Sequence, residues 1–142
     1  MISDIDRIYI AGPLFKDSHI DVIKSIESLL DEADIPYFSP REFGVIANEL
    51  MTKKRMKRIY DMNIDMVAQC DTMIAIIDDR DTGTVFEIGY ASAMSKKIIT
   101  YSSQGYGVNV MLAHAIFTHT QNIDELTLAI DGHEIEELEV SE

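Results

Sequence analysis

The chain has 142 residues, of which 46% are hydrophobic and 26% charged, the composition of an ordinary globular domain. Its 12 basic and 25 acidic residues give a formal net charge of −13, which argues against nucleic acid or an anionic membrane as a partner. A single cysteine, Cys70, excludes an internal disulfide and a cysteine-based zinc cluster, and no apolar run approaches the roughly 20 residues of a membrane span. We therefore expect one cytoplasmic domain over residues 1–142, with an acidic C-terminal tail from about residue 131, that acts on a small molecule.

Segments rich in β-forming residues alternate along the chain with segments whose apolar residues recur at helical spacing. In chain order, the pattern predicts a strand at 7–12, a helix at 18–33, a strand at 36–39, a short helix or ordered loop at 43–50, a helix at 53–70, a strand at 72–77, a polar loop at 78–83, a helix at 85–95, strands at 97–101 and 115–118, and a helix at 122–130. This alternation predicts an α/β fold of the flavodoxin or Rossmann type, in which helices flank a parallel five-stranded sheet.

Ligands of open parallel sheets bind beyond the carboxyl ends of the strands, so the pattern predicts a site built from residues 11–15, 78–87 and 102–111. The densest polar signal of the chain, DDRDTGTVFEIGY at 78–90, lies in the second of these segments. It contains neither of the glycine-rich motifs of phosphate-binding loops, and its carboxylates would repel a phosphate. The segment therefore favours a different chemistry.

Paired carboxylates suit the cleavage of a bond at a sugar anomeric carbon. Gly83 is expected to allow a tight turn, and Glu87 to lie in the first turn of the following helix, where the helix dipole stabilises an anion. An aspartate crowded by like charges has a raised pKa and suits the role of proton donor. Two alternatives stay open for this segment: a helix-terminal glutamate beside a solvated loop, and a Mg²⁺ site, for which no second cluster of oxygen ligands is evident.

Four motifs, each at a strand terminus or leading into a strand, together resemble the nucleoside 2-deoxyribosyltransferase family. They are IYIAGP at 8–13, NIDMVAQCD at 63–71, DTGTVFEIG at 81–89 and GVNVML at 107–112. The resemblance spans about residues 7–112 and implies exchange of the 2-deoxyribosyl group of a 2′-deoxynucleoside between purine or pyrimidine bases. It implies a covalent deoxyribosyl-glutamate intermediate and retained configuration, with no cofactor and no metal.

The resemblance also assigns catalytic roles. Glu87 is expected to attack C1′, Asp81 to contact the base and transfer its proton, and Tyr9 to orient the nucleophile. A covalent step divides one difficult displacement into two easier ones. The alternative for Tyr9 is a strand tyrosine packed in the core.

Five further positions are candidate substrate-binding residues. Gly12 and Phe15 lie in the first loop, where Phe15 is expected to stack on a base or to pack under its own turn. Asn63 matches a residue that helps to hold the site and the sugar, or else lies on an exposed helix face. Asn109 and Met111 match residues that complete the site of a neighbouring subunit, so the resemblance implies a homo-oligomer of dimers, assembled into a hexamer.

Two other functions compete with the transferase. The first is a 2′-deoxynucleoside 5′-monophosphate N-glycosidase, a hydrolase that uses the same glutamate. Such enzymes tend to carry Ser and Arg in the first loop, whereas residues 12–15 here are Gly-Pro-Leu-Phe, and they tend to carry Ser where this chain has Asn109. The second is a non-catalytic nucleotide-sensing module. An assay of base release distinguishes these possibilities.

Overall fold

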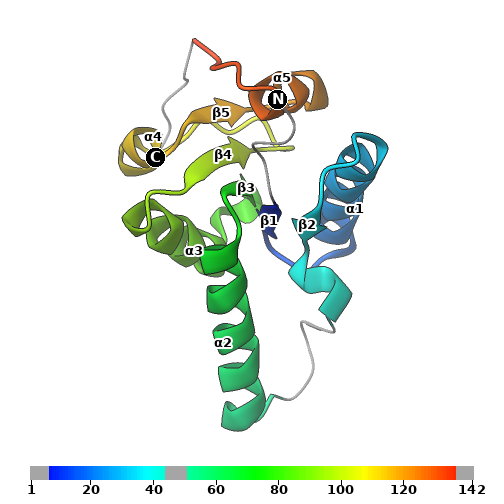
Figure 1. The fold of residues 1–142 in the computed structure, drawn as a ribbon, viewed down its shortest axis with the longest axis vertical. Helices are drawn as coiled ribbons and strands as arrows, with labels where there is room; N and C mark the ends of the chain where they lie inside the picture. The colour runs from blue at the N-terminus through cyan, green and yellow to red at the C-terminus, as the bar shows by residue number, and fades with distance from the viewer. Residues whose placement is uncertain (1–6, 44–50, 137–142) are drawn as a thin grey trace.

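A computed structural model describes residues 7–43 and 51–136. Strands and helices alternate along it as predicted (Figure 1). The elements are β1 (Ile8–Ala11), α1 (Asp17–Glu32), β2 (Tyr37–Phe38), the 3-10 turn η2 (Pro40–Phe43), α2 (Lys53–Gln69), β3 (Thr72–Ile76), the 3-10 turn η3 (Asp78–Arg80), α3 (Thr82–Ala93), β4 (Lys97–Tyr101), α4 (Val110–Ala115), β5 (Thr118–Thr120) and α5 (Ile123–Ile130).

The five strands form one parallel sheet in the order β2-β1-β3-β4-β5, which confirms the predicted fold class. The chain moves outward from β1 to β2 on one side and from β3 to β5 on the other. Because the strand order reverses between β1 and β3, the segments that leave these two strands diverge and open a crevice at their carboxyl ends. This crevice is where the fold places a ligand.

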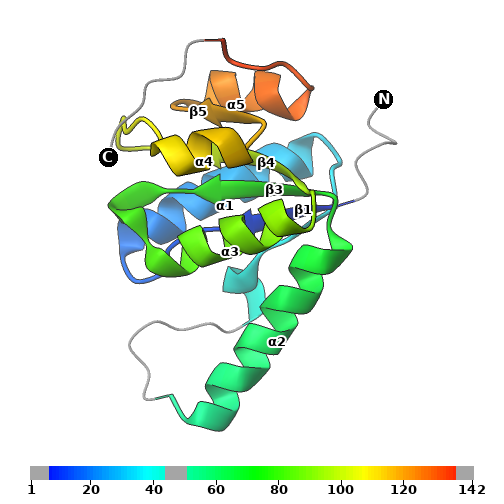
Figure 2. The ribbon, with the colours of Figure 1, turned by 90° about the vertical axis from the view of Figure 1, so that its left-hand side faces the viewer.

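The two faces of the sheet bury different side chains, as the period of two along a strand requires. In β1, Ile8 and Ile10 belong to the apolar cluster that α1 and α5 cover. Tyr9 and Ala11 belong to the opposite cluster, which contains residues of α2 and α3. Figure 2 shows α3 and α4 on one side of the sheet and α1 on the other. Tyr9 therefore points towards the helix that carries Glu87.

The last third of the chain differs in detail from the expectation. Residues 110–115 form the short helix α4, and β5 occupies 118–120 instead of 115–118. All three residues of β5 are buried although none is aliphatic, because hydrogen bonds satisfy their polar atoms; His119 Nδ1 lies 2.8 Å from the Thr100 hydroxyl. Because β5 contains no aliphatic residue, an apolar run in the sequence does not mark its position.

Some expectations lie beyond the described ranges. The short helix or loop expected at 43–50 falls there apart from Phe43, which ends η2, and the acidic tail is described only to Glu136. Within the described ranges, no helix is both long and apolar enough to cross a membrane.

Candidate active site

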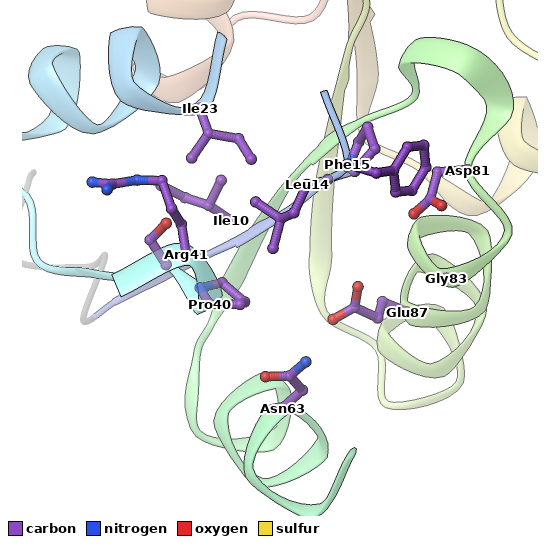
Figure 3. A pocket seen from close by; sticks show the side chains of 13 residues that line it. Ile10, Leu14, Phe15, Ile23, Pro40, Arg41, Asn63, Asp81, Gly83 and Glu87 are labelled. Atoms are coloured by element: carbon purple, nitrogen blue, oxygen red, sulfur yellow. The ribbon is translucent and has the colours of Figure 1, made fainter. Parts of the chain in front are cut away.

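A cavity of about 210 Å³ opens beyond the carboxyl ends of β1, β2 and β3 (Figure 3). Its lining comes from β1, from the segments that follow β1, β2 and β3, and from one residue of α2. The lining residues are Ile10, Gly12, Pro13, Leu14, Phe15, Ile23, Ser39, Pro40, Arg41, Asn63, Asp81, Gly83 and Glu87. Three segments were predicted to form the site. Residues of 11–15 and 78–87 line this cavity, whereas no residue of 102–111 is among the lining residues.

Glu87 of α3 lines the cavity, and Tyr9 of β1 contacts it from the core. The Tyr9 side chain is fully buried, and its hydroxyl donates a short hydrogen bond to Glu87 Oε2. Its ring stacks on Phe38 of the neighbouring strand, with the ring centroids 5.6 Å apart. Burial and the adjacent carboxylate raise the pKa of the Tyr9 phenol far above its ordinary value, so it stays a donor. Tyr9 therefore lies in the core and also contacts the candidate nucleophile.

The environment of Glu87 differs from the one expected from the sequence. The helix α3 begins at Thr82, so Glu87 lies in its second turn, and Gly83 lies within the helix instead of forming a tight turn. Burial, and to a smaller extent the charge of Asp81, raise the pKa of Glu87 to about 7, while the Tyr9 hydrogen bond opposes the rise. The prediction that the helix terminus stabilises ionised Glu87 was therefore wrong. The Tyr9 hydroxyl supplies the stabilising contact.

Asp81 is the N-cap residue of α3. Its Oδ2 accepts hydrogen bonds from the Thr84 backbone N–H at 3.0 Å and from the Thr84 hydroxyl at 2.8 Å. Because Oδ2 is engaged in capping the helix, Oδ1 is the oxygen left for a proton or for a ligand. The same carboxyl group therefore begins the helix and lines the cavity that Glu87 also lines.

The other two aspartates of the segment point elsewhere. Asp78 is buried, and its carboxylate accepts hydrogen bonds from the backbone N–H of Ser103 at 2.9 Å and from its hydroxyl at 2.5 Å. Asp79 Oδ2 lies 2.6 Å from His19 Nε2 and 3.0 Å from Lys16 Nζ, and these contacts hold the pKa of Asp79 well below its usual range. In the described part of the chain, no three His, Cys, Asp or Glu side chains are grouped to hold a metal ion.

Asn63 brings an amide to the cavity from α2. Figure 3 shows its side chain directed towards the same space as Glu87. Its Oδ1 is buried and has no hydrogen-bond partner among the described residues. A buried polar atom without a partner is uncommon in folded proteins, so this oxygen is a candidate acceptor for a ligand group.

The first loop supplies Gly12 and Phe15. A Cβ at Gly12 would lie 3.0 Å from Cδ1 of Ile76 on β3, so a larger residue would push the loop from the strand. The Phe15 ring lines the cavity, is 48% exposed, and meets the ring of His19 edge-on at 4.9 Å between centroids. A bound planar group could therefore cover the exposed face of Phe15.

Asn109 and Met111 do not join these residues. They line a second cavity of about 350 Å³, together with Ile77, Arg80, Val85, Tyr106, Gly107 and Leu112. Met111 is 77% exposed, and the Asn109 side chain caps α4 by accepting from the Met111 backbone N–H at 2.7 Å. Within one copy of the chain, these two residues and Glu87 lie in separate cavities.

The segment after β2, which was not predicted to contribute to the site, supplies Ser39, Pro40 and Arg41 to the lining. Glu27 of α1 is buried beneath it and accepts hydrogen bonds from the Ser39 hydroxyl at 2.6 Å and from Arg41 Nε at 3.0 Å. The same rule that nominated the other loops applies to this one, but a strand of two residues ending at a proline gives a weak signal.

A family model described as nucleoside 2-deoxyribosyltransferase matches residues 8–137, which include every element of the fold. The chain belongs to this family. An uncharacterized protein of Ureaplasma parvum serovar 3 is 30% identical over 102 residues, which are 65% of this chain and 63% of that protein. The chain thus spans less than two thirds of the length of this relative.

Solved structures of other proteins share the fold. A 2-deoxyribosyltransferase of Bacillus psychrosaccharolyticus has a TM-score of 0.77 and 23% identity, over 84% of this chain and 89% of that one. A 2-desoxiribosyltransferase of Leishmania mexicana has a TM-score of 0.56 and 28% identity, over 79% and 73%. A CMP N-glycosidase of Clostridium botulinum has a TM-score of 0.58 and 19% identity, over 88% and 96%.

The raised pKa of Glu87 predicts a pH dependence of stability. Because the folded pKa of about 7 exceeds the ordinary value of 4.5, the folded chain holds this proton more tightly than the unfolded chain. The stabilisation is fully present below pH 4.5 and is lost as the pH rises through 7. Urea unfolding at about pH 5 and about pH 8 is expected to show a fall of order 1–3 kcal/mol that Glu87→Gln lacks. The exposed Glu32→Gln is the control, and an equal fall in Glu87→Gln would contradict the prediction.

Proposed function

We propose that the protein transfers the 2-deoxyribosyl group of a 2′-deoxynucleoside to a free nucleobase, with Glu87 as the nucleophile. The observation that carries the proposal is a carboxylate held by a buried tyrosine hydroxyl at a cavity that a second carboxyl group also lines. Membership of the family supports it, as do the names of two similar structures. The substrates are then 2′-deoxynucleosides and free purine or pyrimidine bases, and the reaction requires no cofactor.

The first half-reaction replaces the base by the enzyme. Tyr9 holds Oε2 of ionised Glu87, and Oε1 attacks C1′ of the sugar. A C–O bond forms as the bond from C1′ to the base nitrogen breaks, and the electron pair of that bond leaves with the base. A proton from Oδ1 of Asp81 neutralises the departing nitrogen. Asn63 Oδ1 accepts a hydrogen bond from the bound substrate.

The second half-reaction reverses these steps with another base. Its ring nitrogen attacks C1′, the bond to Glu87 breaks, and the nitrogen proton returns to Asp81. Two inversions at C1′ give retention of configuration. If water attacks instead of a base, the same intermediate is hydrolysed, so the transferase and a glycosidase differ in the second step alone.

The charges at the cavity favour a substrate without a phosphate. Among the described residues, Arg41 is the one basic side chain in the lining, and its guanidinium donates to the buried carboxylate of Glu27 through Nε and Nη2. Its charge is therefore neutralised, while the ionised Glu87 of the proposed reaction remains to repel a dianion. The similar structure of a CMP N-glycosidase makes a nucleotide hydrolase the second outcome to be tested.

We further propose that Asn109 and Met111 complete the site of a neighbouring copy, in dimers that assemble further. The exposed apolar side chains of this region, Val110 at 53% and Met111 at 77%, support a contact between copies. Capping of α4 uses the Asn109 oxygen, which leaves its NH₂ group to donate a hydrogen bond to a sugar hydroxyl.

The first experiment tests the reaction itself. The protein is incubated with thymidine and adenine, and separately with thymidylate alone, and products are separated chromatographically. Deoxyadenosine and thymine are expected from the first mixture, and Glu87→Ala is expected to lose this activity by several orders of magnitude because the nucleophile is gone. Thymine from thymidylate alone would establish the hydrolase, and base exchange by Glu87→Ala would overturn the role of Glu87. A nucleotide that binds without turnover would indicate a sensing module.

The Tyr9 hydroxyl is expected to set the pH at which the enzyme works. Since its hydrogen bond lowers the pKa of Glu87, Tyr9→Phe raises that pKa above 7, and less ionised Glu87 is present at neutral pH. The acid limb of a plot of kcat/KM between about pH 5 and about pH 9 then moves to higher pH. Tyr37→Phe is the control, because the Tyr37 hydroxyl donates to Glu42 instead of Glu87. An unmoved acid limb in Tyr9→Phe would contradict the prediction.

Shared sites predict complementation between two inactive variants. Glu87→Ala and the double variant Asn109→Ser with Met111→Ala are each expected to be inactive, and serine keeps a capping oxygen for α4. In mixed dimers, one site combines an intact Glu87 with an intact neighbour. Coexpression is therefore expected to restore about a quarter of wild-type activity. No recovery from coexpressed variants, with sedimentation showing mixed dimers, would refute the shared site.

A further inference from the structure

The turn between β3 and α3 has an unfavourable backbone. Asp79 and Arg80 are consecutive non-glycine residues in the left-handed region, with φ of 56° and 51°. Such conformations are unfavourable for residues other than glycine and persist only where surrounding contacts hold them. The next residue is Asp81, which caps α3 and lines the cavity. The contacts that hold the turn therefore decide where Asp81 lies.

Three side chains from two other segments hold Asp79. From the start of α1, His19 Nε2 lies 2.6 Å and Lys16 Nζ 3.0 Å from its Oδ2. From the loop after β4, Gln104 donates to Oδ1 at 3.1 Å and accepts from the Asp79 backbone N–H at 2.9 Å. The histidine is 2% exposed, whereas the lysine side chain is 58% exposed, so the His19 bond is the one shielded from water.

The other face of His19 leads back to the cavity. Its ring meets the Phe15 ring edge-on, and Phe15 lines the cavity. Its Nδ1 is buried and has no hydrogen-bond partner among the described residues. The hydrogen bond from Nε2 to Asp79 therefore orients the ring. A carboxylate accepts, so Nε2 carries the proton of this bond. One imidazole thus joins the loop that carries Phe15 to the turn that precedes Asp81.

We propose that His19 and Asp79 are positioning residues that fix Phe15 and Asp81 relative to each other, and so set the fit of the nucleobase in the cavity. Neither residue lines the cavity, so neither touches the substrate. The base would meet the Phe15 ring and the Asp81 carboxyl together, and a displacement of either weakens base binding before it alters the bond-breaking step. The kinetic form of this inference rests on the proposed function.

The chain offers matched substitutions. His19→Gln places an amide N–H near the position of Nε2 and keeps the bond to Asp79, whereas His19→Leu fills the space without a donor. His19→Leu is expected to raise the KM for adenine by about tenfold, with kcat changed by less than about threefold, because a small displacement of bound groups has a large effect. His19→Gln is expected to recover most of the affinity. Lys16→Met, which removes the exposed contact to Asp79, is expected to stay within about twofold of the wild type.

Three outcomes decide the proposal. An unchanged KM in His19→Leu would overturn it, as would losses of equal size in His19→Leu and His19→Gln. A fall in kcat alone, in proportion to lowered thermal stability, would indicate a merely structural role and would also overturn it.

Crystal structures of the two variants give a reading that does not require turnover. In His19→Leu, Phe15 or the turn at 79–80 is expected to move, whereas in His19→Gln both keep their wild-type positions. An unmoved Phe15 and turn in His19→Leu would overturn the positioning role whatever the activity. If the wild type exchanges no bases while these structures differ as expected, the proposed function fails and the positioning contact stands.

Discussion

The hydrogen bond between the Tyr9 hydroxyl and the Glu87 carboxylate allows both polar groups to be buried. A phenol and a carboxyl group withdrawn from water are each destabilising by several kcal/mol unless they find a partner. The core strand β1 fixes the hydroxyl, and α3 packs on the same face of the sheet, so each group satisfies the other. The balance between burial and this one bond leaves the pKa of Glu87 at about 7, so both protonation states are populated near neutral pH. Ligand binding that excludes further water would act on this balance directly.

Asp81 connects the chemistry to the architecture in a different way. As the N-cap of α3 it stabilises the helix that presents Glu87, typically by about 1 kcal/mol for such a residue. In the proposed reaction, the same carboxyl group donates a proton to the leaving base and accepts one from the incoming base. Because the two functions use different oxygens, the cap can persist while Oδ1 changes its state. The neighbouring Asp78 and Asp79 are not among the lining residues, and their carboxylates are occupied by serine hydroxyls, backbone N–H groups and basic side chains.

The alternation of strand and helix patterns was sufficient to predict the fold class. Strands of a parallel sheet are covered on both faces, so they appear in the sequence as continuous apolar runs such as 72–77. The positions of β5 and α4 did not follow, since β5 is buried but not aliphatic and α4 is only six residues long. The site segments 11–15 and 78–87 followed from the crevice rule. The identity of the capping residue, the left-handed turn at 79–80 and the His19–Asp79 contact did not, because the last joins residues 60 positions apart and leaves no periodic trace. The local pattern of residue types does not predict a contact between residues that only the tertiary fold brings together.

The hydrogen bond between Tyr9 and Glu87 spans 78 positions of sequence, more than half of the chain. It forms only after β1 has paired with β3 and α3 has docked on the sheet. Contacts of such long range form slowly in folding, because the chain must lose the entropy of a large loop first. Formation of the helices alone therefore does not bring Tyr9 and Glu87 together. Formation of this bond during refolding would therefore report that β1, β3 and α3 have assembled.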